Sequence, residues 1–102
     1  MEADKYCPCC GYDTFQEKER LIYTICPICF WEDDPFQFED PELEGGANRV
    51  SLNQGQVSFD TFGASEKEMK RHCRAPNKKD KRKQAYNTGY TPTPAERQAR
   101  GA

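Results

Sequence analysis

Hydrophobic and polar residues follow two different patterns along this chain of 102 residues, and the first forty residues favour strands. Residues 21–25 are aliphatic, β-branched or aromatic and run directly into Cys26, which predicts a strand. Residues 36–38 alternate with a period of two and predict another, while residues 5–6 and 14–15 flank the first cysteines and are candidates to pair. We therefore expect two or three short antiparallel strands.

A helical spacing replaces this pattern after a Gly-Gly turn at residues 45–46. Ser51 is the expected N-cap of the helix, and Gly63 is its expected stop. Because glycine weakens a helix by about 1 kcal/mol relative to alanine, Gly55 indicates a close neighbour at that position. One face of this helix is predicted from spacings of three, four and three, at Leu52, Gly55, Phe59 and Phe62.

A second, shorter helix is predicted to follow. Residues 65–68 read Ser-Glu-Lys-Glu, which matches a capping box, and the helix would continue to about Arg74 before Pro76 ends it. Residues 76–102 contain almost no aliphatic side chain, so burial cannot offset the entropy that is lost on ordering. We expect this basic tail to be disordered when free, and the domain to comprise residues 1–75.

The chain contains six cysteines, and four of them form two copies of one motif. Each copy is a Cys-Pro-x-Cys turn, in which proline fixes φ and both sulfurs can face one ion. Zinc prefers four thiolates in a tetrahedron, and paired motifs of this kind are typical of zinc sites. Iron in the same cage and a pair of disulfides are the alternatives. We predict one structural zinc ion, bound by Cys7, Cys10, Cys26 and Cys29.

Two thiols remain after this assignment. Cys9 lies between two predicted ligands and is expected to point away from the metal as a small buried hydrophobe; a reactive thiol or an alternative ligand are the other interpretations. His72 and Cys73 are about 100° apart on a helix, so we do not expect them to share an ion. Because four thiolates leave zinc no open position for water, we predict no enzyme, with a thiol-dependent enzyme as an alternative.

The formal charge of −2 divides unevenly between an acidic and a basic part. Residues 1–60 hold 13 Asp/Glu and 4 Lys/Arg, and residues 61–102 hold 4 Asp/Glu and 11 Lys/Arg. No apolar run reaches the roughly eighteen residues of a membrane span. With no secretory signal visible at the start, we expect a cytoplasmic protein with reduced thiols.

Seven carboxylates fall within residues 32–44, next to several aromatic side chains. This segment is either a solvated acidic rim or a surface that docks a basic protein, and Trp31 is expected to cover the metal site and the start of the first helix. One version of such a module is an inhibitor or immunity-like protein that covers a basic enzyme cleft. The candidate partner-binding residues are Trp31, Glu32, Asp33, Asp34, Phe36, Glu39 and Asp40.

A basic run follows the predicted domain boundary. Such residues can contact nucleic-acid phosphates without reading base sequence, and they can also be merely solubilising. The candidate phosphate contacts are Lys78, Lys79, Lys81, Arg82 and Lys83. Nucleic-acid binding is therefore the alternative to a protein-interaction module.

Several motifs, in order along the chain, resemble the bacterial cysteine-rich CPCC family. They are YCPCCG at residues 6–11, CPICFWEDD at 26–34, GGAN at 45–48, SL at 51–52 and FGA at 62–64. The resemblance spans residues 5–75 and implies a small bacterial protein that is similar to zinc ribbons. It also implies that the four cysteines of the two turns are the metal ligands, and it implies no activity.

The sequence thus predicts an α+β fold. We expect a small zinc ribbon of two or three short antiparallel strands, then one or two short helices, then a disordered tail. The expected function is non-enzymatic binding of a partner protein.

Overall fold

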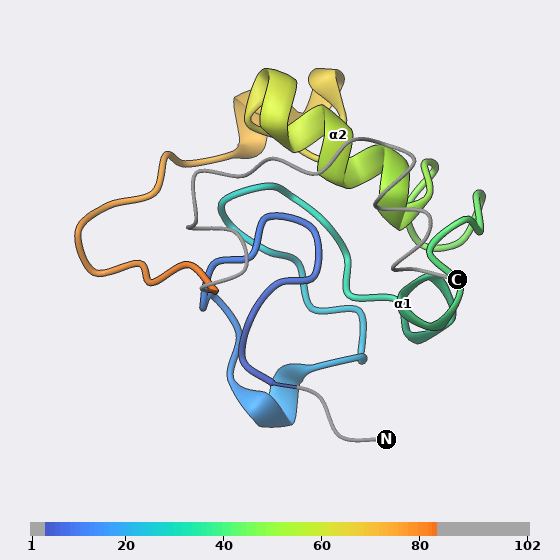
Figure 1. Cartoon of the computed structure of the whole chain (residues 1–102), viewed down its shortest axis with the longest axis horizontal. Coiled ribbons are helices and arrows are strands. Elements are labelled where there is room, and N and C mark those ends of the chain that lie inside the picture. Colours follow the sequence, from blue (N-terminus) through green and yellow to red (C-terminus); the bar gives the residue numbers. More distant parts are fainter. Residues whose placement is uncertain (1–3, 84–102) are drawn as a thin grey trace.

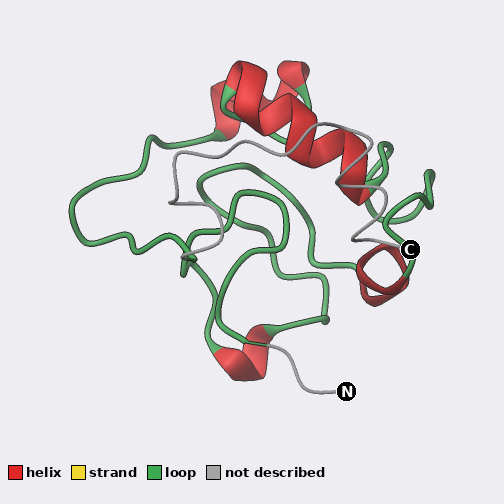
Figure 2. Cartoon of the chain, in the orientation of Figure 1, coloured by secondary structure: helices red, strands yellow, loops and turns green. Residues whose placement is uncertain are grey.

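The computed structural model describes residues 4–83 (Figure 1), and the regular elements in this range are short helices. In chain order they are the 3-10 helix η1 (Glu17–Glu19), the α-helices α1 (Pro35–Glu39) and α2 (Leu52–Phe62), and the 3-10 helix η2 (Lys67–His72). Loops connect them and dominate the first fifty residues (Figure 2). The predicted α+β ribbon is wrong in its strands, because residues 4–83 form isolated β-bridges and no strand.

Residues 21–25 turn where a strand was expected. Leu21 and Tyr23 have φ of 62° and 66°, in the left-handed region that interrupts extended backbone. Asp33 fixes this turn, since its carboxylate accepts from the Leu21 amide (2.8 Å) and its carbonyl accepts from the Tyr23 amide (3.2 Å). Ile25 alone pairs, in an isolated antiparallel bridge. Tertiary contacts here override a local preference for strand.

Residues 36–38, the second predicted strand, belong to α1. The Asp34 carboxylate caps this helix by accepting from the amides of Phe36 (2.8 Å) and Gln37 (3.3 Å). Pro35 occupies the first helical position, where its missing N–H leaves no bond unmade. Three residues of alternating polarity fit one helical turn as well as a strand, and the cap decides between them.

Residues 5–6 and 14–15, which were candidates to pair as strands, share a single backbone hydrogen bond. The amide of Phe15 donates to the carbonyl of Lys5 (3.2 Å). The second bridge of the described chain joins Tyr12 to Arg82, a residue that lies far along the sequence. This part of the molecule is therefore held by turns and by a later segment, and not by a hairpin ladder.

Helix α2 confirms the prediction made for residues 51–63. The Ser51 hydroxyl accepts from the Gln54 amide (3.1 Å), and the Gln54 side chain accepts from the Ser51 amide (2.8 Å), which completes a capping box. Gly63 ends the helix with φ of 79°. The predicted apolar face is buried at its start and turns outward at its end, where Phe62 is 43% exposed.

The second predicted helix is shorter and tighter than expected. It is the 3-10 helix η2, and it begins after Glu66 without a side-chain cap. Ser65, the expected N-cap, is buried, and its amide donates to the carbonyl of Cys29 (2.8 Å). This bond to the second cysteine turn uses the backbone that would have opened an α-helix.

Trp31 lies at the centre of the core, between the cysteines and α2. It is fully buried, and a Cβ placed on Gly55 would lie 3.2 Å from its ring. The same Cβ would lie 3.3 Å from the sulfur of Cys9. Gly55 is therefore small because Trp31 and Cys9 approach the helix backbone there, as the sequence predicted.

A polar cluster organises the loop between α1 and α2. The Gln37 side chain is fully buried, and its amide nitrogen lies within 3.1 Å of the carbonyls of Leu43, Asn48 and Val50. Its amide oxygen accepts from the backbone (3.1 Å) and side chain (2.9 Å) of Asn48. One side chain thus supplies the bonds that a sheet would otherwise provide.

Residues 74–83, which we call the strap, loop out on the left of Figure 1 and are bonded near both ends to the cysteine turns. The amide of Arg74 donates to the carbonyl of Pro27 (3.0 Å) at the start of the strap. The guanidinium of Arg74 pairs with Asp80 (2.8 Å), and this bond lowers the pKa of the Asp80 carboxyl to about 2. The strap begins, accordingly, against the second pair of cysteines.

The far end of the strap lies on the first pair of cysteines. Asp13 exchanges two bonds with Lys81: its amide donates to the Lys81 carbonyl (2.9 Å), and its carboxylate accepts from the Lys81 amide (2.8 Å). The amide of Lys83 donates to the carbonyl of Gly11 (2.7 Å). The first eight residues of the predicted disordered tail are thus bonded to the domain, and the rest of that tail lies outside the described residues.

Candidate metal centre

The four predicted ligands meet at one point. Their sulfur atoms lie within 4.8 Å of one another, and all four side chains are buried. Cys7 and Cys29 are 3.6 Å apart, and Cys10 and Cys26 are 3.7 Å apart. Bonds of about 2.3 Å in a tetrahedron place sulfurs about 3.8 Å from each other. The separations fit four thiolates around one ion, and they exceed the roughly 2.05 Å of a disulfide.

The two turns that hold these sulfurs, residues 7–12 and 26–31, repeat one backbone geometry. The amides of Gly11 and Phe30 each donate to the carbonyl of the first cysteine of their turn, both at 2.8 Å. Both residues have positive φ, 84° and 69°. In both turns the amide of the first cysteine donates to the carbonyl five residues later, at 2.9 Å. The site is built from two copies of the same knuckle.

Burial shapes the protonation of the thiols. It raises the pKa of Cys7 and Cys29, because a thiolate in the core has lost its water. Hydrogen bonds from the neighbouring thiols, and also from Thr14, lower the pKa of Cys26. The Thr14 hydroxyl lies 3.1 Å from the Cys26 sulfur, a contact that sequence reasoning missed. Four buried thiols can all ionise only beside a cation, so metal binding there releases protons.

A metal site of four buried thiolates suits a structural role better than a catalytic one. Structural sites complete a tetrahedron with protein ligands, whereas catalytic sites keep one position for water or substrate. The cluster is consistent with a structural metal site of the first kind. In a comparison with known families, the model of the family described as Cysteine-rich CPCC matches residues 5–80. The chain belongs to this family.

The CPCC match extends past the boundary predicted after residue 75. It takes in residues 74–80 of the strap, which include the bond from Arg74 to the second knuckle. A search of curated proteins finds no match. Within residues 4–83 there is no helix long and apolar enough to cross a membrane.

Cys9 and Cys73 are not among the four clustered sulfurs, although the side chain of Cys9 interacts with that of Cys29. Cys9 is buried against α2, and Cys73 is half-buried, with its thiol donating to the carbonyl of Met69 (3.3 Å). Burial raises the pKa of Cys73, which opposes formation of a thiolate. The neighbouring His72 stacks on Phe30 (5.0 Å between ring centres). The structure does not bring a histidine to either thiol.

Three of the predicted partner-binding residues serve the fold instead. Trp31, Asp33 and Asp34 are buried, so they are not available on the surface as predicted. Asp34 caps α1 and also accepts from the Ala47 amide (2.8 Å). The carboxylates that the sequence placed on an acidic rim are needed here as acceptors for backbone amides.

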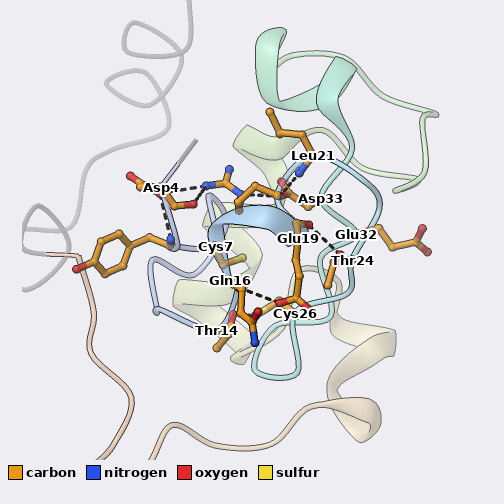
Figure 3. Close-up of polar contacts among 12 residues, drawn as sticks. Asp4, Cys7, Thr14, Gln16, Glu19, Leu21, Thr24, Cys26, Glu32 and Asp33 are labelled. Atoms are coloured by element: carbon orange, nitrogen blue, oxygen red, sulfur yellow. Dashed lines mark hydrogen bonds and ion pairs between the residues drawn. The ribbon is translucent and has the colours of Figure 1, made fainter. Parts of the chain in front are cut away.

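Asp33 belongs to a buried ion pair near the knuckles. Its carboxylate accepts from Arg20 (2.6 Å) and from the Leu21 amide, and Arg20 also pairs with Asp4 (3.0 Å) (Figure 3). The Arg20 side chain is 2% exposed. No sequence pattern pointed to this arginine, because its partners are distant along the chain.

The remaining residues of the acidic segment do reach the surface. Phe36 is 66% exposed, Glu39 and Asp40 are exposed, and Glu32 is half-buried. The backbone of Glu32 is bonded on both sides by the Asn48 side chain (2.9 and 2.8 Å). The surface portion of the predicted docking segment is therefore α1 and the residues that follow it.

The basic run divides in a similar way. The guanidinium of Arg82 donates to the carbonyl of Cys10 (2.9 Å) and lies over the ring of Tyr12 (5.3 Å). Lys83 pairs with Asp4 (2.9 Å). These two cations hold the strap in place, whereas the other three candidates are exposed: Lys78, Lys79 and Lys81.

Proposed function

We propose that this CPCC domain is a zinc-stabilised module that binds a basic partner protein through its acidic end. We define the acidic end as α1 with residues 40–44. The observation that carries the proposal is Phe36, a large aromatic side chain that is 66% exposed beside the carboxylates of Glu39 and Asp40. Exposed aromatic residues surrounded by charge are frequent anchors of protein interfaces.

The charge of this end favours a basic partner. Residues 32–44 contain seven Asp/Glu and no Lys or Arg, and those that reach the surface face water. Complementary charge steers association and excludes wrong partners. An aromatic side chain such as Phe36, once the partner covers it, supplies affinity. An inhibitor or immunity-like protein that covers a basic cleft is one form that such a module can take.

Apolar side chains next to the acidic end extend the candidate surface. Ile22 is 61% exposed, and Tyr23 beside it bonds through its amide to the Asp33 carbonyl (3.2 Å). The turn at residues 21–25 therefore lies against the segment that leads into α1. Ile22 is thus a second exposed apolar side chain that we propose for the interface, in addition to Phe36.

The choice of zinc rests on ligand chemistry. Four buried cysteine sulfurs with tetrahedral spacing suit zinc, and iron is the competitor for the same cage. Metal analysis of the purified chain tests the choice. We expect one zinc per chain and no visible absorption; a coloured protein with bound iron would contradict the assignment.

Affinity capture tests the docking surface. The full chain and a Phe36→Ser, Glu39→Gln variant are immobilised in parallel, together with a Phe62→Ser control that removes an exposed aromatic residue elsewhere. We expect a basic protein to bind the full chain and the control but not the acidic-end variant, and to elute with salt. Equal capture by all three chains would overturn the proposal.

A further inference from the structure

A second charged surface lies at the end of the molecule away from α1. Residues 67–83 contain nine Lys/Arg and two Asp/Glu. They form η2, which lies behind the C-terminal part of α2 at the top of Figure 1, and the strap, which loops out on the left, while α1 lies on the right. The charge asymmetry of the sequence is thus also an asymmetry of the folded domain.

Part of this positive charge is used inside the domain. Arg74 pairs with Asp80, and Lys83 pairs with Asp4. The ammonium group of Lys70 lies against Gly63, where a Cβ would be 2.6 Å away, at the C-terminal end of α2. A cation at this position is stabilised by the helix dipole.

Five further cations point to the surface, although Lys67 lies over the ring of Phe62 (5.4 Å) and Arg71 donates to the His72 ring (3.3 Å). All are exposed, and within residues 4–83 none of them forms an ion pair with a carboxylate. The two acids of this region are already engaged, Asp80 by Arg74 and Glu68 beside Arg49 (3.8 Å). We call this set the basic face: Lys67, Arg71, Lys78, Lys79 and Lys81.

The metal knuckles hold the basic face in position. The strap is bonded to the carbonyls of Pro27 at one end and of Gly11 and Cys10 at the other. Its lysines are therefore displayed from a fixed backbone, which lowers the entropy that is lost when they bind a ligand.

We propose that the basic face binds the phosphate backbone of nucleic acid without reading base sequence. Phosphate contacts require cations in register and no apolar anchor. Residues 76–83 offer cations and no exposed apolar or aromatic side chain apart from Pro76, whereas a protein partner needs such anchors for affinity. The acidic end does not oppose this binding, because it lies on the other side of the molecule.

Binding of the full chain to a fluorescently labelled, mixed-sequence DNA duplex tests the proposal, with anisotropy measured over a range of KCl concentrations. Five phosphate contacts predict a slope of log K against log [salt] of about −4.5. A Lys78→Gln, Lys79→Gln variant is expected to reduce the magnitude of the slope by about 1.8. A scrambled duplex should bind equally well.

A Lys18→Gln variant is the matched control, because Lys18 is an exposed cation on η1. It should leave the slope unchanged, and unchanged metal content in all variants shows that they fold. The Phe36→Ser, Glu39→Gln variant should also bind DNA normally, which separates this proposal from that of the acidic end. Absence of DNA binding at low salt, or a slope insensitive to Lys78 and Lys79, would overturn the inference. Tighter binding to phosphatidylserine vesicles or to polyglutamate than to DNA would overturn it as well.

Discussion

Cys9 and Cys10 are neighbours in the chain with different surroundings. The sulfur of Cys10 lies 3.7 Å from that of Cys26 in the metal cluster, while Cys9 packs against Gly55 of α2. In a turn with two residues between the outer cysteines, only these outer cysteines, Cys7 and Cys10, can face the ion. At this scale the sequence alone identified the four cysteines that cluster, because their spacing is a local geometric property.

This difference predicts opposite results for two adjacent substitutions. Cys10→Ala should lose the bound metal and the cooperative unfolding transition, because three thiolates no longer close the site. Cys9→Ala should keep one metal per chain and lose about 1 kcal/mol of unfolding free energy from reduced packing. Metal analysis and thermal unfolding measure both; loss of metal from Cys9→Ala would instead make Cys9 a ligand.

Gly55→Ala should destabilise the domain although alanine favours helices. The new methyl group would lie 3.2 Å from the Trp31 ring and 3.3 Å from the Cys9 sulfur, and both side chains are fully buried. We expect a loss of about 1–3 kcal/mol, as in other overpacked cores. Urea unfolding of the metal-loaded protein measures it, with Thr61→Ala as an exposed control on the same helix. A gain in stability would contradict this prediction and would show that the Trp31 side chain can shift to make room for the methyl group.

At the scale of elements, α1 and its following loop depend on one glutamine. Gln37 bonds to the carbonyls of Leu43, Asn48 and Val50 and accepts twice from Asn48, all inside the domain. The loop has no strand to satisfy these groups. Its conformation is therefore specified by a single polar side chain and by the Asp34 cap of the helix.

Gln37→Leu should consequently be far more damaging than its polar character suggests. Several buried carbonyls and the Asn48 donors would lose their partner, each at a cost of about 1–3 kcal/mol before relaxation. We expect a net loss of about 2–4 kcal/mol. Glu39→Gln, two residues away on the exposed side of α1, is the control and should stay within about 0.5 kcal/mol of the natural chain. Similar stability of the two variants would contradict the role assigned to Gln37.

The same elements show what the sequence could predict. Both ends of α2 followed from local signals, Ser51 as the N-cap and Gly63 as the stop. The Asp34-Pro35 signal for α1 was equally local and was outweighed by an alternation only three residues long. The turn at residues 21–25 could not be predicted, because it is fixed by Asp33 through bonds that exist only in the fold.

The strap was missed for a related reason. Its bonds run to carbonyl groups of the knuckles, and a carbonyl has no signature in sequence. Low aliphatic content correctly indicated that residues 76–83 bury little apolar surface. It did not reveal that backbone hydrogen bonds, and the stacking of Arg82 on Tyr12 (5.3 Å), hold this segment.

At the scale of the whole molecule, the proposed metal takes the place of a sheet, which residues 4–83 do not contain. The buried hydrophobic residues gather around the four ligands, and the described regular elements are short. Helix α2 has 11 residues, too few to persist alone in water. If the four cysteines hold a metal as proposed, most of the packing in the domain depends on one coordination sphere.

Removal of the metal should accordingly unfold residues 5–60. Trp31 is the single tryptophan of the chain and lies buried between the knuckles and α2. We expect a strong chelator to shift its fluorescence to longer wavelength, and added zinc to restore it. Unchanged tryptophan emission and thermal stability in verified metal-free protein would count against a structural metal.

The ion pair between Asp4 and Lys83 has a consequence for engineering. It joins the side chains of residues 4 and 83, the two ends of the described range, at 2.9 Å, so these two points of the chain lie close together on the surface. A short linker across this junction would allow circular permutation, with new termini opened in the exposed loop at residues 44–47. The same closeness would let residues 4–83 be inserted into a surface loop of another protein, where zinc would then control the folding of the insert.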